Sequence, residues 1–191
     1  MGIFRIFKKK SLSKKIKRND ILNENDSISY LYVSDRELFD KEFDALLRKA
    51  KSKIPNTELH DLPHIKEAPD VPDWYVFEHE IWGIGEEIRQ LTLKYKKTFS
   101  KEQLERVIDI CLDKRVKRGR QSFVMLLGKK AYCDYADAII HLLEDEDVDG
   151  HVIDTLYKMQ VGRYVNLITP FAEHKITWIK NEAKRYIKKY K

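Results

Sequence analysis

Residues 100–112 have the sequence SKEQLERVIDICL, and this stretch decides the fold class. Ser100 and Gln103 have the spacing of a capping box, in which each side chain bonds the other residue's backbone amide at a helix start. The residues behind this cap are apolar at helical spacing: Leu104, Val107, Ile108, Cys111 and Leu112. Ser34 and Glu37 repeat the device before a second apolar stripe. The two stretches predict amphipathic helices and an all-α fold.

Further apolar stripes predict helices within residues 74–95, 116–127, 132–143, 152–159 and 176–190. Asp73 is the expected N-cap of the first of these. Gly83 and Gly85 lie inside that helix and predict either a kink or a close neighbour. Gly128 directly follows the stripe at 116–127, and a glycine in this position is a common signal for the C-terminal end of a helix. The short connections predict that consecutive helices pack antiparallel.

The length of 191 residues, with only 7 Gly and 5 Pro, fits one helical domain, either alone or with an appendage. Four of the prolines fall in residues 55–72, which predicts an irregular loop. The chain therefore divides into a basic flexible leader at 1–20, an N-terminal helical region at 21–99 and a repetitive helical region at 100–191. Whether 21–99 continues the repeats or forms a separate cap stays open at this point.

The net charge of +6 is concentrated at the two ends of the chain. Residues 1–20 hold eight basic residues and one acid, and residues 180–191 hold six basic residues and one acid. The body between them is acidic, so the basic isoelectric point does not by itself indicate a nucleic-acid-binding face. Both cysteines, Cys111 and Cys133, lie in apolar helical stripes, which predicts free thiols and a reducing, cytoplasmic setting.

The first residues, MGIFRIFKKK, place the basic cluster after the apolar residues and so do not resemble a signal peptide. No stretch approaches the ~20 apolar residues that a membrane span requires. Ile3, Phe4, Ile6 and Phe7 beside lysines predict either a peripheral membrane contact through residues 1–20 or a solubilising leader.

Three segments resemble the HEAT-repeat family. VKRGRQSFVMLLG (116–128) and IKNEAKRYI (179–187) resemble the second helix of such a repeat, and IIHLLEDEDVDGHV (139–152) resembles the end of a first helix with its acidic turn. The resemblance covers residues 100–191, with departures at Ile153 and Pro170 and with uneven repeat lengths. It implies a short α-solenoid of antiparallel helix pairs whose second helices line a concave face.

The strongest surface signal in the body is a cluster of basic residues within an acidic domain: Lys114, Arg115, Lys117, Arg118, Arg120, Lys129 and Lys130. On the second-helix face, such a cluster would meet an acidic or phosphate-bearing partner. The alternative is an ordinary solvated helix face.

The stretch EDEDVDGHVIDTL (144–156) resembles the start of a calcium-binding loop. Asp145, Asp147, Asp149 and Gly150 match its first, third, fifth and sixth positions, but Leu156 replaces the bidentate Glu at the twelfth. The pattern therefore favours a corner between two helices, in which carboxylates bond backbone amides and stabilise the next helix start. Weak cation binding by the three aspartates is the alternative.

The sequence contains no clear motif for metal binding or for nucleophilic catalysis. His60, His64 and His79 are ligand types, but Gly83 occupies the position of the second histidine in a helical metal motif. No hydroxyl or thiol stands in a motif that would activate it. The sequence predicts no catalytic residue, no metal and no cofactor.

The main hypothesis is a non-enzymatic module that binds another protein. The family resemblance implies that such a module would be a bacterial adaptor or a toxin-neutralising immunity protein. The rival hypothesis is a HEAT-like nucleic-acid-binding protein, such as a DNA glycosylase for alkylated bases. Its candidate residues are Asp73, Trp74, Tyr75, Trp82 and Trp178, for which core packing is the simpler account. A third hypothesis, a membrane-surface adaptor tethered by residues 1–20, is compatible with the first.

Overall fold

The computed structural model describes residues 34–60 and 75–191, and the chain is helical there, with no strand in these two ranges. The α-helices are α1 (Asp35–Lys51), α2 (Val76–Tyr95), α3 (Lys101–Leu112), α4 (Arg120–Leu126), α5 (Ala136–Ile139), α6 (Asp149–Met159), α7 (Val165–Ile168) and α8 (Thr177–Tyr190). Several predicted features lie outside the described residues: the leader at 1–20, His64, Asp73, Trp74, Pro63, Pro69 and Pro72. No described helix is both long and apolar enough to cross a bilayer.

Both predicted capping boxes are confirmed. The amide of Glu37 donates to Ser34 Oγ at 3.2 Å, and the amide of Ser34 donates to Glu37 Oε2 at 2.8 Å. The amide of Gln103 donates to Ser100 Oγ at 3.2 Å, and Gln103 Oε1 accepts from the amide of Ser100 at 3.0 Å. Each box satisfies two backbone donors that a helix start leaves unpaired.

Helix α2 begins differently from the prediction, because Tyr75 and not Asp73 is its N-cap. Glu78 completes this start by accepting a hydrogen bond from the Tyr75 amide at 2.6 Å. The helix continues through Gly83 and Gly85 without a break. A Cβ at Gly85 would lie 2.6 Å from the Cβ of Ser122 on α4, whereas one at Gly83 would meet nothing within 4 Å. The close neighbour, one of the two expected explanations, is therefore the correct one at Gly85.

Two of the expected helices are shorter or more broken than their stripes predict. Lys114–Gly119 forms 3₁₀ turns with a kink at Lys117, whose φ is +51°, and only then does α4 begin. The stripe at 132–143 is divided into 3₁₀ turns at Lys130–Tyr135 and Ile140–Glu144 with the short α5 between them. Tyr132 lies at the kink in the first of these turns and is buried in the core, where its hydroxyl accepts from the Phe99 amide at 2.9 Å. Tertiary packing has overridden local helical periodicity here.

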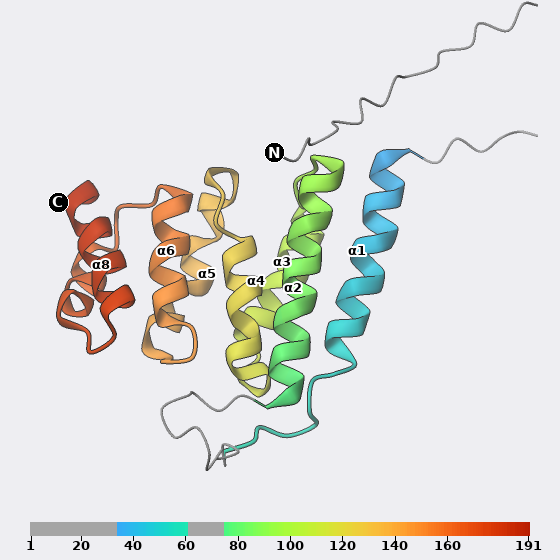
Figure 1. Ribbon diagram of the computed structural model, residues 1–191. Coiled ribbons are helices and arrows are strands. Elements are labelled where there is room, and N and C mark those ends of the chain that lie inside the picture. Colours follow the sequence, from blue (N-terminus) through green and yellow to red (C-terminus); the bar gives the residue numbers. More distant parts are fainter. Residues whose placement is uncertain (1–33, 61–74) are drawn as a thin grey trace, which may run out of the picture. The chain divides into compact units, whose positions relative to one another are not determined.

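Four helices stand side by side in the order α2, α4, α6, α8, and consecutive members of this row contact one another (Figure 1). Helices α3 and α5, with the 3₁₀ turns beside α5, pack behind the row, and α7 with its following turn packs on α8. Helix α1 packs against α2. One continuous apolar core runs from Phe39 on α1 to Tyr186 on α8. Residues 34–60, 75–99 and 100–191 thus share a core.

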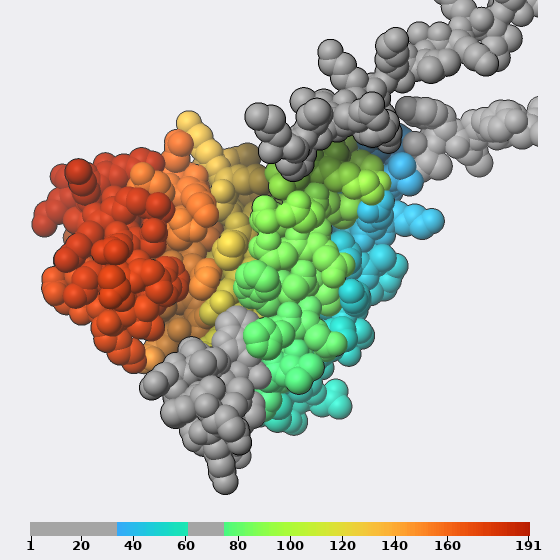
Figure 2. Space-filling view, in the orientation of Figure 1, coloured from blue at the N-terminus to red at the C-terminus, as the bar shows by residue number. Residues whose placement is uncertain are grey.

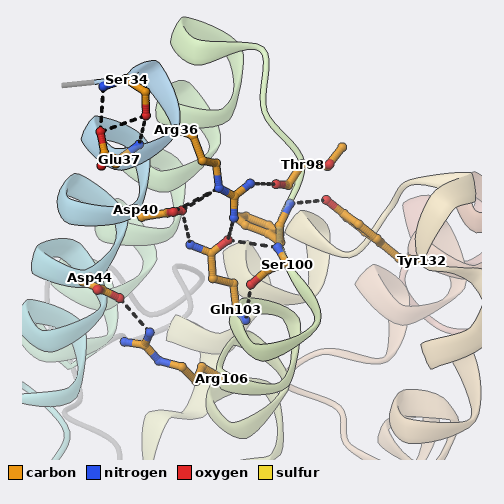
Figure 3. A network of polar contacts seen from close by, with 11 residues as sticks. Ser34, Arg36, Glu37, Asp40, Asp44, Thr98, Ser100, Gln103, Arg106 and Tyr132 are labelled. Carbon is orange, nitrogen blue, oxygen red and sulfur yellow. Dashed lines mark hydrogen bonds and ion pairs between the residues drawn. The ribbon is translucent and has the colours of Figure 1, made fainter. Parts of the chain in front are cut away.

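A polar network joins α1 to the start of α3 (Figure 3). Arg36 donates to Asp40 on its own helix, to the Thr98 carbonyl and to Gln103, each at 3.0 Å. Gln103 in turn donates to Asp40 at 2.9 Å. The same glutamine therefore caps α3 and anchors α1 to it.

The two cysteines differ in their surroundings. Cys111 is fully buried, and burial raises the pKa of its thiol, whereas Cys133 is partly exposed. Since the thiolate is the reactive form, we expect the native protein to react with one equivalent of a disulfide reagent such as Ellman's reagent, and with two equivalents in urea. Cys133→Ser should abolish the native reaction. Fast native labelling of that variant would contradict the buried position of Cys111.

Candidate protein-binding face

The seven basic residues predicted as a binding patch lie in two places, at opposite ends of α4. Lys114 and Arg115 are exposed before the helix, and Arg115 bonds Asp113 at 2.6 Å. Lys117 and Arg118 are partly buried at the helix start, where the Arg118 amide donates to Glu78 at 2.9 Å. Lys129, partly buried, and Lys130, exposed, follow the other end of the helix. The structure does not bring the seven together as one patch.

Arg120 has to be removed from the predicted patch, because its side chain is only 1% exposed. Its guanidinium donates to the Lys117 carbonyl at 2.9 Å and to Asp145 Oδ2 at 2.7 Å. Asp147 Oδ2 lies 3.7 Å from the same nitrogen. A buried guanidinium requires such partners to offset the loss of hydration. Arg120 therefore joins α4 to the acidic turn before α6 and has no surface to offer a partner.

The acidic stretch is a corner between helices, as its sequence favours. Asp145 Oδ1 accepts from the Asp147 amide at 3.1 Å, and α6 begins at Asp149. The Asp149 carboxylate accepts from the Gly150 amide at 2.5 Å and lies 3.6 Å from His174. Two of the three aspartates thus face Arg120, and no cluster of three potential metal ligands occurs within 34–60 and 75–191.

A different surface emerges on the outer side of the helix row. Each helix presents a stripe at spacings of three or four residues, the spacing of side chains on one helix face. We call these twelve residues the row face: Trp82, Glu86, Arg89 and Leu93 on α2, Gln121 and Met125 on α4, His151, Asp154 and Lys158 on α6, and Trp178, Glu182 and Arg185 on α8.

Contacts join the stripes of α6 and α8, and Met125 of α4 lines one cavity with Leu93 of α2 and Lys158 of α6. Gln121 donates to the Asp147 carbonyl at 2.7 Å, and Arg185 bonds Asp154 at 2.9 Å. The rings of His151 and Trp178 meet edge to face with centroids 5.0 Å apart. Figure 2 shows this side of the molecule, with the surface over α4 set back between α2 and α8.

The row face combines balanced charge with exposed apolar groups. Its acids and bases pair within the face: Glu86 with Arg89 at 2.7 Å, Asp154 with Lys158 at 2.6 Å, and Glu182 with Arg185. Trp178 is 44% exposed and Leu93 is 59% exposed. The face also combines tryptophan and arginine, two residue types that are enriched at protein interfaces.

His151, on the row face, is expected to make the folding stability of the protein depend on pH. Burial lowers the pKa of this imidazole, an effect that Asp154 partly opposes. The unfolded chain then takes up the proton more readily than the folded one, so stability is complete above a pH of about 6.5 and falls as the pH drops below it.

We expect the melting temperature to fall between pH 7 and pH 5, and the fall to be smaller in His151→Gln. An unchanged slope in His151→Gln would show that other groups carry the dependence.

Sequence reasoning missed the row face because no local motif marks it. The basic cluster drew attention as a run of one charge, whereas the row face takes two to four residues from each of four helices. The sequence does show which side of each helix is polar and aromatic. These sides indicate a common surface only when the order of the helices in the row is known. Of the residues proposed for nucleic-acid chemistry, Trp82 and Trp178 belong to this face. Tyr75 is instead an N-cap, and its ring stacks on Phe77.

Searches against protein-family models, curated proteins and solved structures found no match to this chain.

Proposed function

We propose that this protein is a non-enzymatic binding module that holds another protein against its row face, and that its architecture is a short α-solenoid of antiparallel helix pairs. The observation that carries the proposal is the row itself. Four neighbouring helices present one continuous surface, set back along α4, with exposed Trp178 and Leu93 among paired charges. Stacked helices that share a core commonly use such a surface for binding.

The charge of the face favours a protein over nucleic acid as the partner. The row face carries three acids and three arginines or lysines, paired with one another. A nucleic-acid site requires an excess of positive charge that follows the phosphate backbone. Tryptophan and arginine, by contrast, are enriched at the centres of protein interfaces.

A nucleic-acid-binding protein remains the second candidate, because Trp82 and Trp178 share one face and aromatic side chains stack on bases. Salt-sensitive binding to single- or double-stranded DNA would support it, since neutralised phosphates release counterions. Peripheral membrane attachment through residues 1–20 is a separate proposal, tested by vesicle cosedimentation of the full chain against residues 21–191.

The family resemblance implies an adaptor or a toxin-neutralising immunity protein as the biological role of this module. The two cysteines in helical stripes favour a reducing, cytoplasmic location. An adaptor or an immunity protein binds its partner in a fixed ratio, so identifying that partner would define the biological role of this protein.

Affinity purification from native lysate tests the proposal when two matched variants accompany the parent protein. Glu86 on the row face pairs with Arg89, and Glu105 on α3 behind the row pairs with Lys101. We expect Glu86→Lys to weaken recovery of a stoichiometric protein at least tenfold and Glu105→Lys to leave it unchanged. Equal recovery by both variants would exclude the row face, and nuclease-sensitive recovery of nucleic acid would favour the second candidate.

A further inference from the structure

A small cavity lies between the C-terminal halves of α2, α4 and α6, on the row face. Its volume is about 260 Å³, and its lining is mainly apolar, with Leu93 from α2 and Met125 from α4. Small-molecule sites usually measure about 300–1,000 Å³, so this cavity is better matched to a single side chain. It is therefore of a size to receive one anchoring residue of a bound protein.

Three cations from three different segments also line this cavity: Arg89, Lys129 and Lys158. No carboxylate is among its lining residues. Arg89 and Lys158 are paired with Glu86 and Asp154, neither of which lines the cavity. The cavity thus has an apolar interior and a positive rim.

Lys129 is the member without a counter-ion. Within residues 34–60 and 75–191 its ammonium makes no ion pair, and its one aromatic contact is with the Tyr132 ring at 5.9 Å from the centroid. The side chain is partly buried, and burial lowers the pKa of its ammonium. A partly desolvated charge without a partner is unfavourable, and an incoming carboxylate would relieve it.

A structural role for the three cations is the alternative. Lys158 lies in the last turn of α6, and Lys129 follows the end of α4, where the carbonyl groups carry partial negative charge and stabilise a nearby cation. That effect does not extend to Arg89, which lies before the last turn of α2. Nor does it account for the partial burial of Lys129 when Lys130 beside it is exposed.

We infer that this cavity receives a carboxylate side chain, an Asp or Glu with an apolar neighbour, from the protein bound at the row face. The inference rests on the proposed function and states which kind of side chain the bound protein inserts into the cavity. Lys129 forms the ion pair, Arg89 and Lys158 strengthen the positive rim, and Leu93 and Met125 contact the adjoining apolar group. A charged pair at the centre of an interface, surrounded by contacts that exclude water, dominates binding energy in many complexes.

The test uses two capped dipeptides, acetyl-Leu-Glu-amide and acetyl-Leu-Gln-amide, which differ only in the carboxylate. NMR titration of the full chain follows the Met125 methyl group and the Lys129 side chain. We expect saturable shifts with the Glu peptide and at least tenfold weaker binding of the Gln peptide. Lys129→Met should weaken the Glu peptide at least tenfold, and the matched variant Lys130→Met should leave it unchanged.

Three results would overturn the inference: no shift at Met125 with either peptide, equal affinity for both peptides, or an equal loss in Lys130→Met. Its failure is distinguishable from failure of the proposed function. If Glu86→Lys abolishes recovery of a protein partner while neither peptide binds, the partner does bind at the row face, but it does not insert a carboxylate into the cavity. If the Glu peptide binds but Glu86→Lys and Glu105→Lys recover a partner equally, the cavity binds carboxylates without serving the row face.

Discussion

Replacing Arg120 by Met is expected to lower the free energy of unfolding by about 3–5 kcal/mol, the range for removing one partner of a buried ion pair. Met fills most of the vacated volume, so the loss is mainly electrostatic. The Asp145 carboxylate loses its donor at 2.7 Å, and the Lys117 carbonyl loses its donor at 2.9 Å. The turn that leads into α6 would then hold uncompensated charge against the core.

Urea unfolding followed by circular dichroism measures this loss, and Arg115→Met is the matched control. Arg115 also pairs with an aspartate, Asp113, but its side chain is 44% exposed, so solvent screens the pair and little stability should be lost. The double variant Arg120→Met, Asp145→Asn should recover part of the loss, because it removes the orphaned charge as well. Equal effects of the two arginine variants would show that Arg120 is not buried in solution.

Alanine at Gly85 and at Gly83 is expected to change stability in opposite directions, although the two positions lie on the same helix. Alanine favours the helix by up to about 1 kcal/mol over glycine. At Gly83 no packing contact opposes this gain, since no atom of another described segment lies within 4 Å of the new methyl group. At Gly85 the methyl group would lie 2.6 Å from the Cβ of Ser122, so α2 and α4 would have to separate. Overpacking of this kind typically costs about 1–3 kcal/mol.

Thermal and urea unfolding of the two variants measure the difference directly. Gly83→Ala should be as stable as the parent protein or more stable, and Gly85→Ala should be less stable. Adding Ser122→Gly to Gly85→Ala should restore stability, because it removes the atom that the methyl group meets. Stabilisation by Gly85→Ala alone would show that α2 and α4 do not approach at this point, which would remove the contact on which the row depends.

Those parts of the fold that depend on nearest neighbours in sequence could be predicted. The capping boxes at Ser34 and Ser100 need only residues three apart, and both are present. The corner at Asp145–Asp149 followed from the residue that replaces the last calcium ligand. The all-α class followed from the stripes. Each of these is decided by short-range geometry.

The parts that depend on distant partners could not be predicted. Arg120 was assigned to the surface because its neighbours in sequence are basic, while the aspartate that receives it is 25 residues away. The stripe at 132–143 has helical periodicity, yet it is divided into 3₁₀ turns and the short α5, with Tyr132 bonded to the distant Phe99 amide. The row face is assembled from four helices, and its composition becomes visible only when their order in space is known.

Photo-crosslinking tests the central claim, that the row face contacts a protein partner, most directly. A benzophenone amino acid placed at Gln121 on α4, a member of the row face, is compared with one at Glu105 on α3, behind the row. The account predicts that irradiation in native lysate links one protein in a fixed ratio at Gln121 and none at Glu105. A partner that crosslinks at Glu105 and not at Gln121 would contradict it, because binding would then use the opposite side of the molecule.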